Sequence, residues 1–188
     1  MNRPEFRSIS YSYTTITELM IPSYANFGGK IHGGIILSLM DKVAYACAAK
    51  HAGGYCVTVS MNGVDFLSPV EVGDLVHLHA SVNYVGHSSI VIGIRVEAEN
   101  ITTGEVRHTN TSYLTMVAMN NDRTPRTVPG LILESKKDIR RFLMAKHRRQ
   151  LIQEFRKETS EFDKRVDIDA NAPGLMGERC MVIDERED

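Results

Sequence analysis

The sequence predicts an α+β fold in which a five-stranded antiparallel sheet packs against one long apolar helix. Three observations lead to this fold class. A nearly uninterrupted apolar run, residues 35–49, follows a glycine-rich loop and ends close to Gly53. Segments in which apolar and polar residues alternate precede and follow this run. Short turns join the later alternating segments, and short turns are typical of strands that are antiparallel neighbours.

The strands are predicted from alternation and from their content of β-branched and aromatic residues. The first is rich in Tyr, Thr and Ile, and Pro22 ends it. Residues 102–104 read Thr-Thr-Gly and predict a hairpin turn between the last two strands. The five expected strands span residues 8–21, 55–67, 75–85, 88–101 and 107–119.

The apolar run predicts a helix over residues 34–51. It is rich in alanine, a good helix former, and Gly53 is a plausible C-cap. Because the run is apolar nearly all round, we expect the helix to be buried on most sides, by the sheet and by a second subunit. Asp41 is the one carboxylate inside the run, and a buried carboxylate costs free energy unless it is paired or used. Asp41 is therefore the first residue to explain.

The composition changes after Met119. Residues 120–129 are polar and contain prolines, which predicts a loop, and residues 135–157 predict a charged helix. Few apolar residues follow. We therefore expect one folded domain over residues 1–130, and a charged helical extension and tail over residues 131–188 that packs partly on the domain.

The bulk composition argues against several classes of function. A formal net charge of −1 is unlike that of a general nucleic-acid binder. No run reaches the roughly 18 apolar residues of a membrane span, and residues 1–5 lack the apolar core of a secretory signal. The cysteines, Cys47, Cys56 and Cys180, show no CxxC spacing, and the first two lie in apolar segments. We expect those two to be buried reduced thiols in a cytoplasmic protein.

Asn26, Gly29, Gly33, Gly34 and Asp41 form the pattern N-x-x-G-x-x-x-G-G-x-x-x-x-x-x-D. The pattern resembles that of the hotdog-fold acyl-coenzyme A thioesterases, and is most similar to the group of YciA-type bacterial enzymes and brain-type acyl-CoA hydrolases. The similarity spans residues 14–149 and includes the segments VT at 57–58, DFLxPVxVGD at 65–74, GxSS at 86–89 and PRxVP at 125–129. It implies a hotdog fold, with the sheet wrapped around the central helix. It also implies hydrolysis of acyl-CoA to free coenzyme A and a fatty acid.

Thioester hydrolysis needs an attacking water or carboxylate, and donors for the oxyanion that develops. A helix N-terminus offers unpaired N–H groups, so we place the thioester carbonyl at the N–H of Gly34, beside Gly33. By the resemblance, Asp41 acts as general base or as a nucleophile that forms an anhydride, and the sequence leaves both roles open. Asn26 would orient the attacking water or the carbonyl.

The helical rise separates these groups within one chain. At about 1.5 Å per residue, Asp41 lies roughly 10 Å from Gly34. The resemblance implies that the site forms at a dimer interface, where Asp41 of one subunit faces Gly33 and Gly34 of its partner. It also implies a homohexamer assembled as a trimer of dimers.

The coenzyme A portion of the substrate needs partners for its phosphates. The resemblance assigns these to Gly86, Ser88 and Ser89, and Arg126 is a candidate because a guanidinium suits phosphate geometry. The acyl chain is expected between the helix and the sheet. The resemblance implies no metal or redox cofactor, coenzyme A being bound only as part of substrate or product.

Three alternatives compete with this interpretation. A non-catalytic acyl-CoA binding or sensing protein would keep the fold and lose the acid, whereas Asp41 and Asn26 are both present. A hydratase of the same fold would pair an aspartate with a histidine along the helix, and His51 lies off the expected face. His77 and His79 share a strand face, but a metal site would need further ligands that the sequence does not supply.

Overall fold

The computed structural model describes residues 5–175 and 177–181. The chain forms two compact units, Met1–Lys146 and His147–Asp188. Residues 1–4, and residues 182–188 at the end of the predicted tail, lie outside the described residues, so the structure does not test what was expected of them.

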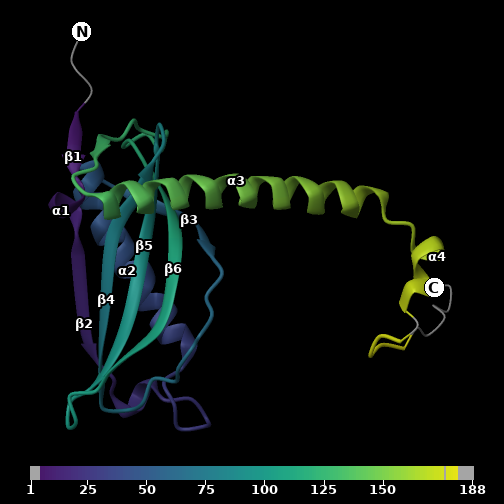
Figure 1. Cartoon of the computed structure of the whole chain (residues 1–188), viewed down its shortest axis with the longest axis horizontal. Coiled ribbons are helices and arrows are strands. Elements are labelled where there is room, and N and C mark those ends of the chain that lie inside the picture. The colour runs from purple at the N-terminus through teal and green to yellow at the C-terminus, as the bar shows by residue number, and fades with distance from the viewer. Residues whose placement is uncertain (1–4, 176, 182–188) are drawn as a thin grey trace. The chain divides into compact units, whose positions relative to one another are not determined.

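Five antiparallel strands form the main sheet of the first unit, in the spatial order β2-β4-β5-β6-β3 (Figure 1). This confirms the predicted five-stranded antiparallel sheet. The strands span Thr14–Leu19 (β2), Cys56–Asn62 (β3), Asp74–Val85 (β4), Ser89–Asn100 (β5) and Val106–Ala118 (β6).

The strand order differs from a simple succession of hairpins. β4, β5 and β6 are neighbours as predicted, but β3 pairs with β6 and β2 pairs with β4. The expectation that short turns make all the later strands neighbours is therefore wrong for β3 and β4, which residues 63–73 connect across the end of the sheet. Alternation could not reveal this, because it shows which face of a strand is buried and not which strand lies beside it.

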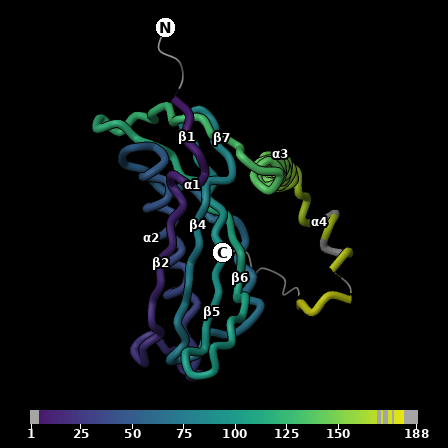
Figure 2. The backbone as a smooth tube through the Cα atoms, turned by 60° about the vertical axis from the view of Figure 1, so that its left-hand side comes forward, coloured from purple at the N-terminus to yellow at the C-terminus, as the bar shows by residue number. Residues whose placement is uncertain are grey.

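Helix α2, Gly33–Ala52, lies along one face of the sheet and contacts all five strands (Figure 2). Its inward stripe packs on the buried side chains of β4, β5 and β6 to form the core. Gly53 ends the helix with a φ of 68°, and its N–H donates to the carbonyl of Ala49 at 2.8 Å. The predicted C-cap is confirmed. The buried residues of α2 are Ile36, Leu39, Met40, Val43, Ala44, Cys47, Ala48, His51 and Ala52.

The single strand expected over residues 8–21 is wrong at its start. The chain forms β1 (Phe6–Ser8), one helical turn α1 (Ile9–Ser12), and then β2. The hydroxyl of Ser8 accepts a hydrogen bond from the N–H of Tyr11 at 3.3 Å, and such local bonds compete with strand pairing. β1 pairs in parallel with β7 (Gly130–Ile132) in a separate two-stranded sheet.

The charged helix predicted after the core is confirmed as α3, Lys136–Arg165, which extends beyond the predicted end. Its first turns belong to the first unit, where the ring of Phe142 lies 5.0 Å from that of Tyr84 and Ala145 is buried. In the second unit, α4 (Ile168–Asn171) and the 3-10 turn η2 (Ala172–Leu175) follow. No helix in the described part of the chain is both long and apolar enough to cross a membrane.

Candidate active site

Asn26 organises the loop that leads into α2. Its side-chain Oδ1 accepts hydrogen bonds from the N–H groups of Gly28 at 2.8 Å and Lys30 at 3.2 Å. Gly29 adopts a φ of 76°, which closes the turn. Across residues 5–175 and 177–181, nothing accepts a hydrogen bond from Asn26 Nδ2, so this exposed amide remains available as a donor.

The N-terminus of α2 is capped by a histidine. Nδ1 of His32 accepts a hydrogen bond from the N–H of Gly34 at 2.9 Å. The N–H of Ile35 donates to the backbone carbonyl of His32, also at 2.9 Å. The Gly34 donor chosen for the substrate carbonyl is therefore paired here, whereas the N–H of Gly33 has no acceptor among the described residues.

Asp41 lies on an exposed side of α2, together with Ser38 and Tyr45. All three side chains are exposed, so the expectation that Asp41 is buried is wrong for a single chain. The buried stripe of α2 is one-sided, and the side that carries Asp41 is exposed in the single chain.

Thr58 on β3 fixes the Asp41 carboxylate. Its hydroxyl donates to Asp41 Oδ1 at 2.6 Å, a short bond of the kind that ionised acceptors make. Thr58 shares a strand face with the buried Cys56, and the register between β3 and β6 shifts between Thr58 and Ser60, as at a β-bulge. Bulges are common beside active sites, where they re-aim a side chain. Thr58 was part of the resemblance to the family, but the sequence analysis gave it no role. The one sequence feature that pointed to a role was its hydroxyl on the strand that follows the helix.

The two groups do not meet within one chain. Asn26, Gly33 and Gly34 gather at the start of α2, and Asp41 lies with Thr58 further along. The helical rise still separates Asp41 from Gly34 by roughly 10 Å.

The predicted coenzyme A residues gather at the opposite end of α2. The N–H of Val128 donates to the carbonyl of His87 at 3.0 Å, which places the segment containing Arg126 beside the turn at residues 86–89. Within that turn, the N–H of Gly86 already donates to the carbonyl of Ser89 at 2.8 Å. The half-buried hydroxyls of Ser88 and Ser89 have no partner in the described part of the chain.

Arg126 is folded back on the C-terminus of α2. Its Nη2 donates to the carbonyl of Ala52 at 2.8 Å, while its buried Nε has no hydrogen-bond partner among the described residues. A cation is favourable at this negative end of the helix dipole. Arg126 therefore has a structural task in the protomer, and a phosphate would have to use its remaining N–H groups.

The buried titratable side chains of α2 are not suited to catalysis. Burial raises the pKa of the Cys47 thiol to about 12, and that of Cys56 on β3 to about 11, so neither is a thiolate at neutral pH. Both are buried free thiols, as predicted. Burial lowers the pKa of His51, whose ring lies within hydrogen-bond distance of Ser12 and of the carbonyl of Pro129. His51 therefore does not pair with Asp41.

His77 and His79 lie on the other face of the sheet. Their Nε2 atoms lie 2.9 Å from Glu99 and 3.4 Å from Glu97. Among the described residues, no group of three or more His, Cys, Asp or Glu side chains could hold a metal ion.

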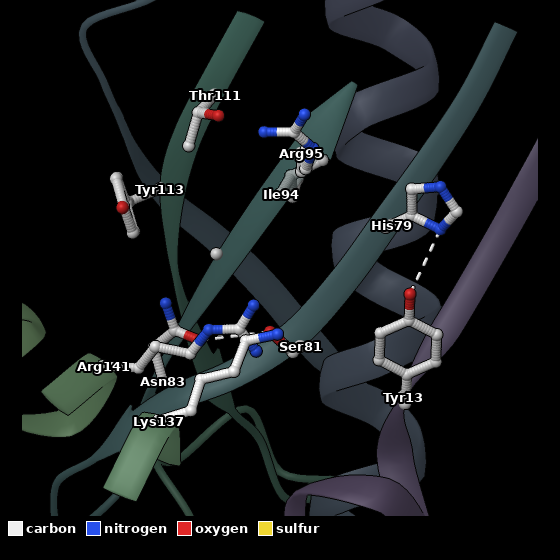
Figure 3. A pocket seen from close by; sticks show the side chains of 11 residues that line it. Tyr13, His79, Ser81, Asn83, Ile94, Arg95, Thr111, Tyr113, Lys137 and Arg141 are labelled. Carbon is white, nitrogen blue, oxygen red and sulfur yellow. Dashed lines mark hydrogen bonds between the residues drawn. The ribbon is translucent and has the colours of Figure 1, made fainter. Parts of the chain in front are cut away.

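A cavity of about 270 Å³ also lies on that outer face (Figure 3). Side chains of β4, β5 and β6 line it together with Lys137 and Arg141 from α3, which lie next to Ser81 and Asn83 in the close view. The sheet separates this cavity from Asp41 and α2, so it is not part of the candidate active site.

Comparison with known proteins gives relatives over most of the chain. Residues 28–105 match the thioesterase superfamily. Protein VdlD of Helicobacter pylori is 42% identical over 133 residues, which cover 71% of this chain and 76% of that protein. The uncharacterized acyl-CoA thioester hydrolase YkhA of Bacillus subtilis is 35% identical over 139 residues, which cover 74% of this chain and 81% of that protein.

Two solved structures are similar in fold. An acyl-CoA hydrolase from Staphylococcus aureus, in complex with butyryl coenzyme A, coenzyme A and coenzyme A disulfide, has a TM-score of 0.77 and 28% identity, covering 85% of this chain and 97% of that chain. An apo-hexameric acyl-CoA thioesterase has a TM-score of 0.76 and 34% identity, and the match covers 83% of this chain and 97% of that chain. Variants of the Staphylococcus enzyme with an aspartate, an asparagine or a threonine changed to alanine are also similar.

Proposed function

The chain belongs to the thioesterase superfamily and has the hotdog fold, and from this premise we propose that it hydrolyses acyl-CoA thioesters to free coenzyme A and a fatty acid. One observation carries the proposal: α2 presents at its N-terminus the N–H of Gly33, which has no acceptor among the described residues, and further along a carboxylate fixed by the Thr58 hydroxyl. The acyl-CoA hydrolases among its relatives support this substrate class.

In the proposed reaction Asp41 either takes a proton from water or attacks the carbonyl and forms an anhydride that water then hydrolyses. In both cases the electron pair of the carbonyl moves onto its oxygen, where a backbone N–H of Gly33 or Gly34 donates to it. One such donor is typically worth ~2.7–4 kcal/mol in the barrier. The C–S bond breaks as the carbonyl re-forms, and the coenzyme A thiolate takes the proton that water gave to Asp41, or a proton from water in the anhydride route. The free amide of Asn26 orients the water or the carbonyl.

This chemistry requires no metal or redox cofactor, because a carboxylate, water and amide donors supply every proton and charge that moves. Coenzyme A binds as part of the substrate, with its phosphates at Gly86, Ser88, Ser89 and Arg126. The free thiols of the chain favour a cytoplasmic location.

We further propose that two subunits share each active site. β3 is an edge strand of the sheet, and Val59 on it is 58% exposed. Close by, the exposed rings of Tyr45 and Tyr55 lie 6.3 Å apart.

An open strand edge beside exposed apolar side chains favours pairing with a second copy of the chain. Two antiparallel α2 helices would then bring Asp41 of one subunit to Gly33 of the other. The hexameric relative supports a homohexamer, and we propose that this chain would form it as a trimer of dimers.

The decisive experiment measures thiol release from acyl-CoAs by the wild type, Asp41→Ala and Asn26→Ala. Loss of a general base costs roughly 10²–10⁴-fold in rate, so Asp41→Ala should lose turnover on this scale while still binding acyl-CoA. Asp163→Ala, at an exposed aspartate of α3, is the matched control and should keep wild-type activity. Undiminished hydrolysis by Asp41→Ala contradicts the mechanism. Binding without turnover by the wild type favours the sensing alternative.

A further inference from the structure

A second cavity, of about 350 Å³, opens beside the N-terminus of α2. Its walls come from the loop before α2, from the first turn of α2, and from the segment between β3 and β4. The wall is predominantly apolar, and its apolar residues are Ile31, Ile36, Phe66, Leu67, Pro69 and Val70. The cavity therefore offers hydrocarbon contact on several sides, as pockets for apolar ligands do.

Phe66 lines this cavity and packs on the start of α2. A Cβ placed on Gly33 would lie 3.3 Å from Phe66 Cζ, so the ring packs against the bare backbone of the first helical residue. Phe66 is 48% exposed, but hydrogen bonds hold the backbone on both sides of the cavity wall. The N–H of Leu67 donates to the carbonyl of Thr109 at 2.8 Å, and the N–H of Ile31 donates to that of Val70 at 2.9 Å. The ring of Phe66 therefore contacts the cavity, while the backbone that carries it is held in place by hydrogen bonds.

The one charged side chain lining the cavity is that of Lys30. Its Nζ contacts both carboxylate oxygens of Glu71, at 2.6 and 2.8 Å. This cation is therefore already neutralised. Burial of a further carboxylate in apolar surroundings is costly without a free partner. The cavity suits an uncharged hydrocarbon chain and does not suit a chain that ends in a second acid.

We propose that this cavity binds the acyl chain of the thioester, and that Phe66 and Ser68 set the chain length that it accepts. The inference rests on the proposed function, which places the thioester carbonyl at the N-terminus of α2. Gly33 belongs both to that donor group and to the cavity wall, so a chain leaving the carbonyl enters the cavity past the ring of Phe66. Ser68 is a half-buried polar residue of the wall that a larger side chain could extend into the space.

The test compares kcat/KM for straight-chain acyl-CoAs from acetyl to palmitoyl. Phe66→Ala enlarges the cavity and should move the preferred length to longer chains. Ser68→Leu fills it and should move the preference to shorter ones. A single methylene in an apolar pocket is commonly worth on the order of tenfold or more, so the ratio of long-chain to short-chain kcat/KM should change by at least that factor. The matched control is Phe162→Ala, at a phenylalanine of α3 that is 56% exposed.

A second series uses acyl-CoAs of equal length that end in a methyl group or in a carboxylate. The wild type should prefer the methyl-ended chain by more than tenfold, and Glu71→Gln, which frees the Lys30 cation, should reduce this preference. If the wild type is active and Phe66→Ala and Ser68→Leu both keep its length profile, the cavity is not the acyl site although the proposed function stands. If the wild type hydrolyses none of these thioesters, both proposals are overturned.

Discussion

Asp41 is held by one hydrogen bond from the hydroxyl of Thr58, and the two residues come from different elements. The bond leaves the second carboxylate oxygen for water or substrate, and it limits the orientations that the acid can adopt. A hydrogen bond to a charged group contributes about 1.5–3 kcal/mol. Asn26 is placed in a different way, by bonds to its own loop that leave its amide nitrogen free.

Thr58→Val keeps the shape of the side chain but removes the donor. If that bond is made in the transition state, the loss corresponds to a kcat lower by roughly ten- to a hundredfold. Thr58→Ser keeps a hydroxyl and should retain most of the activity. Steady-state thiol release by the two variants checks this, and a Thr58→Val enzyme with wild-type kcat would show that orientation of Asp41 does not depend on the bond.

His51 should make the stability of the fold depend on pH. Burial lowers its pKa in the folded chain, so below the ordinary histidine value of about 6.5 the unfolded chain binds more protons. The contribution of His51 is therefore complete above this pH and declines as the pH falls towards its folded pKa. Urea denaturation at pH 7.5 and pH 5 measures the free energy of unfolding. Its decrease between the two pH values should be smaller for His51→Gln than for the wild type. His147→Gln, at an exposed histidine, should behave as the wild type.

At the scale of elements, the two ends of α2 are fixed by different chemistry. Gly53 ends the helix through a left-handed backbone conformation that its sequence position suggested. The beginning depends on His32, whose side chain accepts from Gly34. That bond satisfies an orphan donor in the free protomer, and it occupies an amide that the proposed reaction uses.

His32→Ala removes this cap. Loss of a capping acceptor typically costs about 1 kcal/mol, so the Tm should fall by roughly 2–4 °C. Thiol release should persist, because the variant leaves the Gly34 amide open to the substrate carbonyl. Calorimetry and kinetics together check the prediction, with His147→Ala, at an exposed histidine of α3, as control. A folded but inactive His32→Ala enzyme would instead place His32 in the chemistry.

At the scale of the whole molecule, the proposed active site is incomplete in one chain. The donors of Gly33 and Gly34 and the acid of Asp41 lie roughly 10 Å apart along a rigid helix. A second copy related by a two-fold axis would supply the missing half to each site. The exposed Asp41 face of α2 and the open edge of β3 are the surfaces available for that copy.

Mixing two inactive variants tests the shared site directly. Asn26→Ala and Asp41→Ala subunits, unfolded and refolded together in equal amounts, should give dimers of which half are mixed. Each mixed dimer has one site with both residues intact, so about a quarter of the wild-type activity should return. Refolding each variant alone is the control. No recovery in a mixture shown to contain mixed dimers would mean that each chain carries a complete site.

The sequence by itself determined the elements and the family. Periodicity gave the helix, four of the five main strands and the charged helix α3, because the spacing of apolar residues reports which face of an element is buried. The Asn26-to-Asp41 motif indicated the thioesterase superfamily and the proposed catalytic residues except Thr58, and the later segments at 86–89 and 125–129 supplied the coenzyme A candidates. The helical turn at Ile9–Ser12 was missed, because it depends on a local Ser8 bond within a strand-like composition.

Only the tertiary structure decided how these parts meet. The pairing of β3 with β6, the bond from Thr58 to Asp41 and the contact of Phe66 with Gly33 all join residues that are distant in sequence. The exposure of Asp41 was equally undetermined, since an apolar run shows that a helix is buried but not whether its own chain or a second one buries each side. Contacts of this kind depend on strand order and helix orientation, and the local pattern of a sequence carries no record of either.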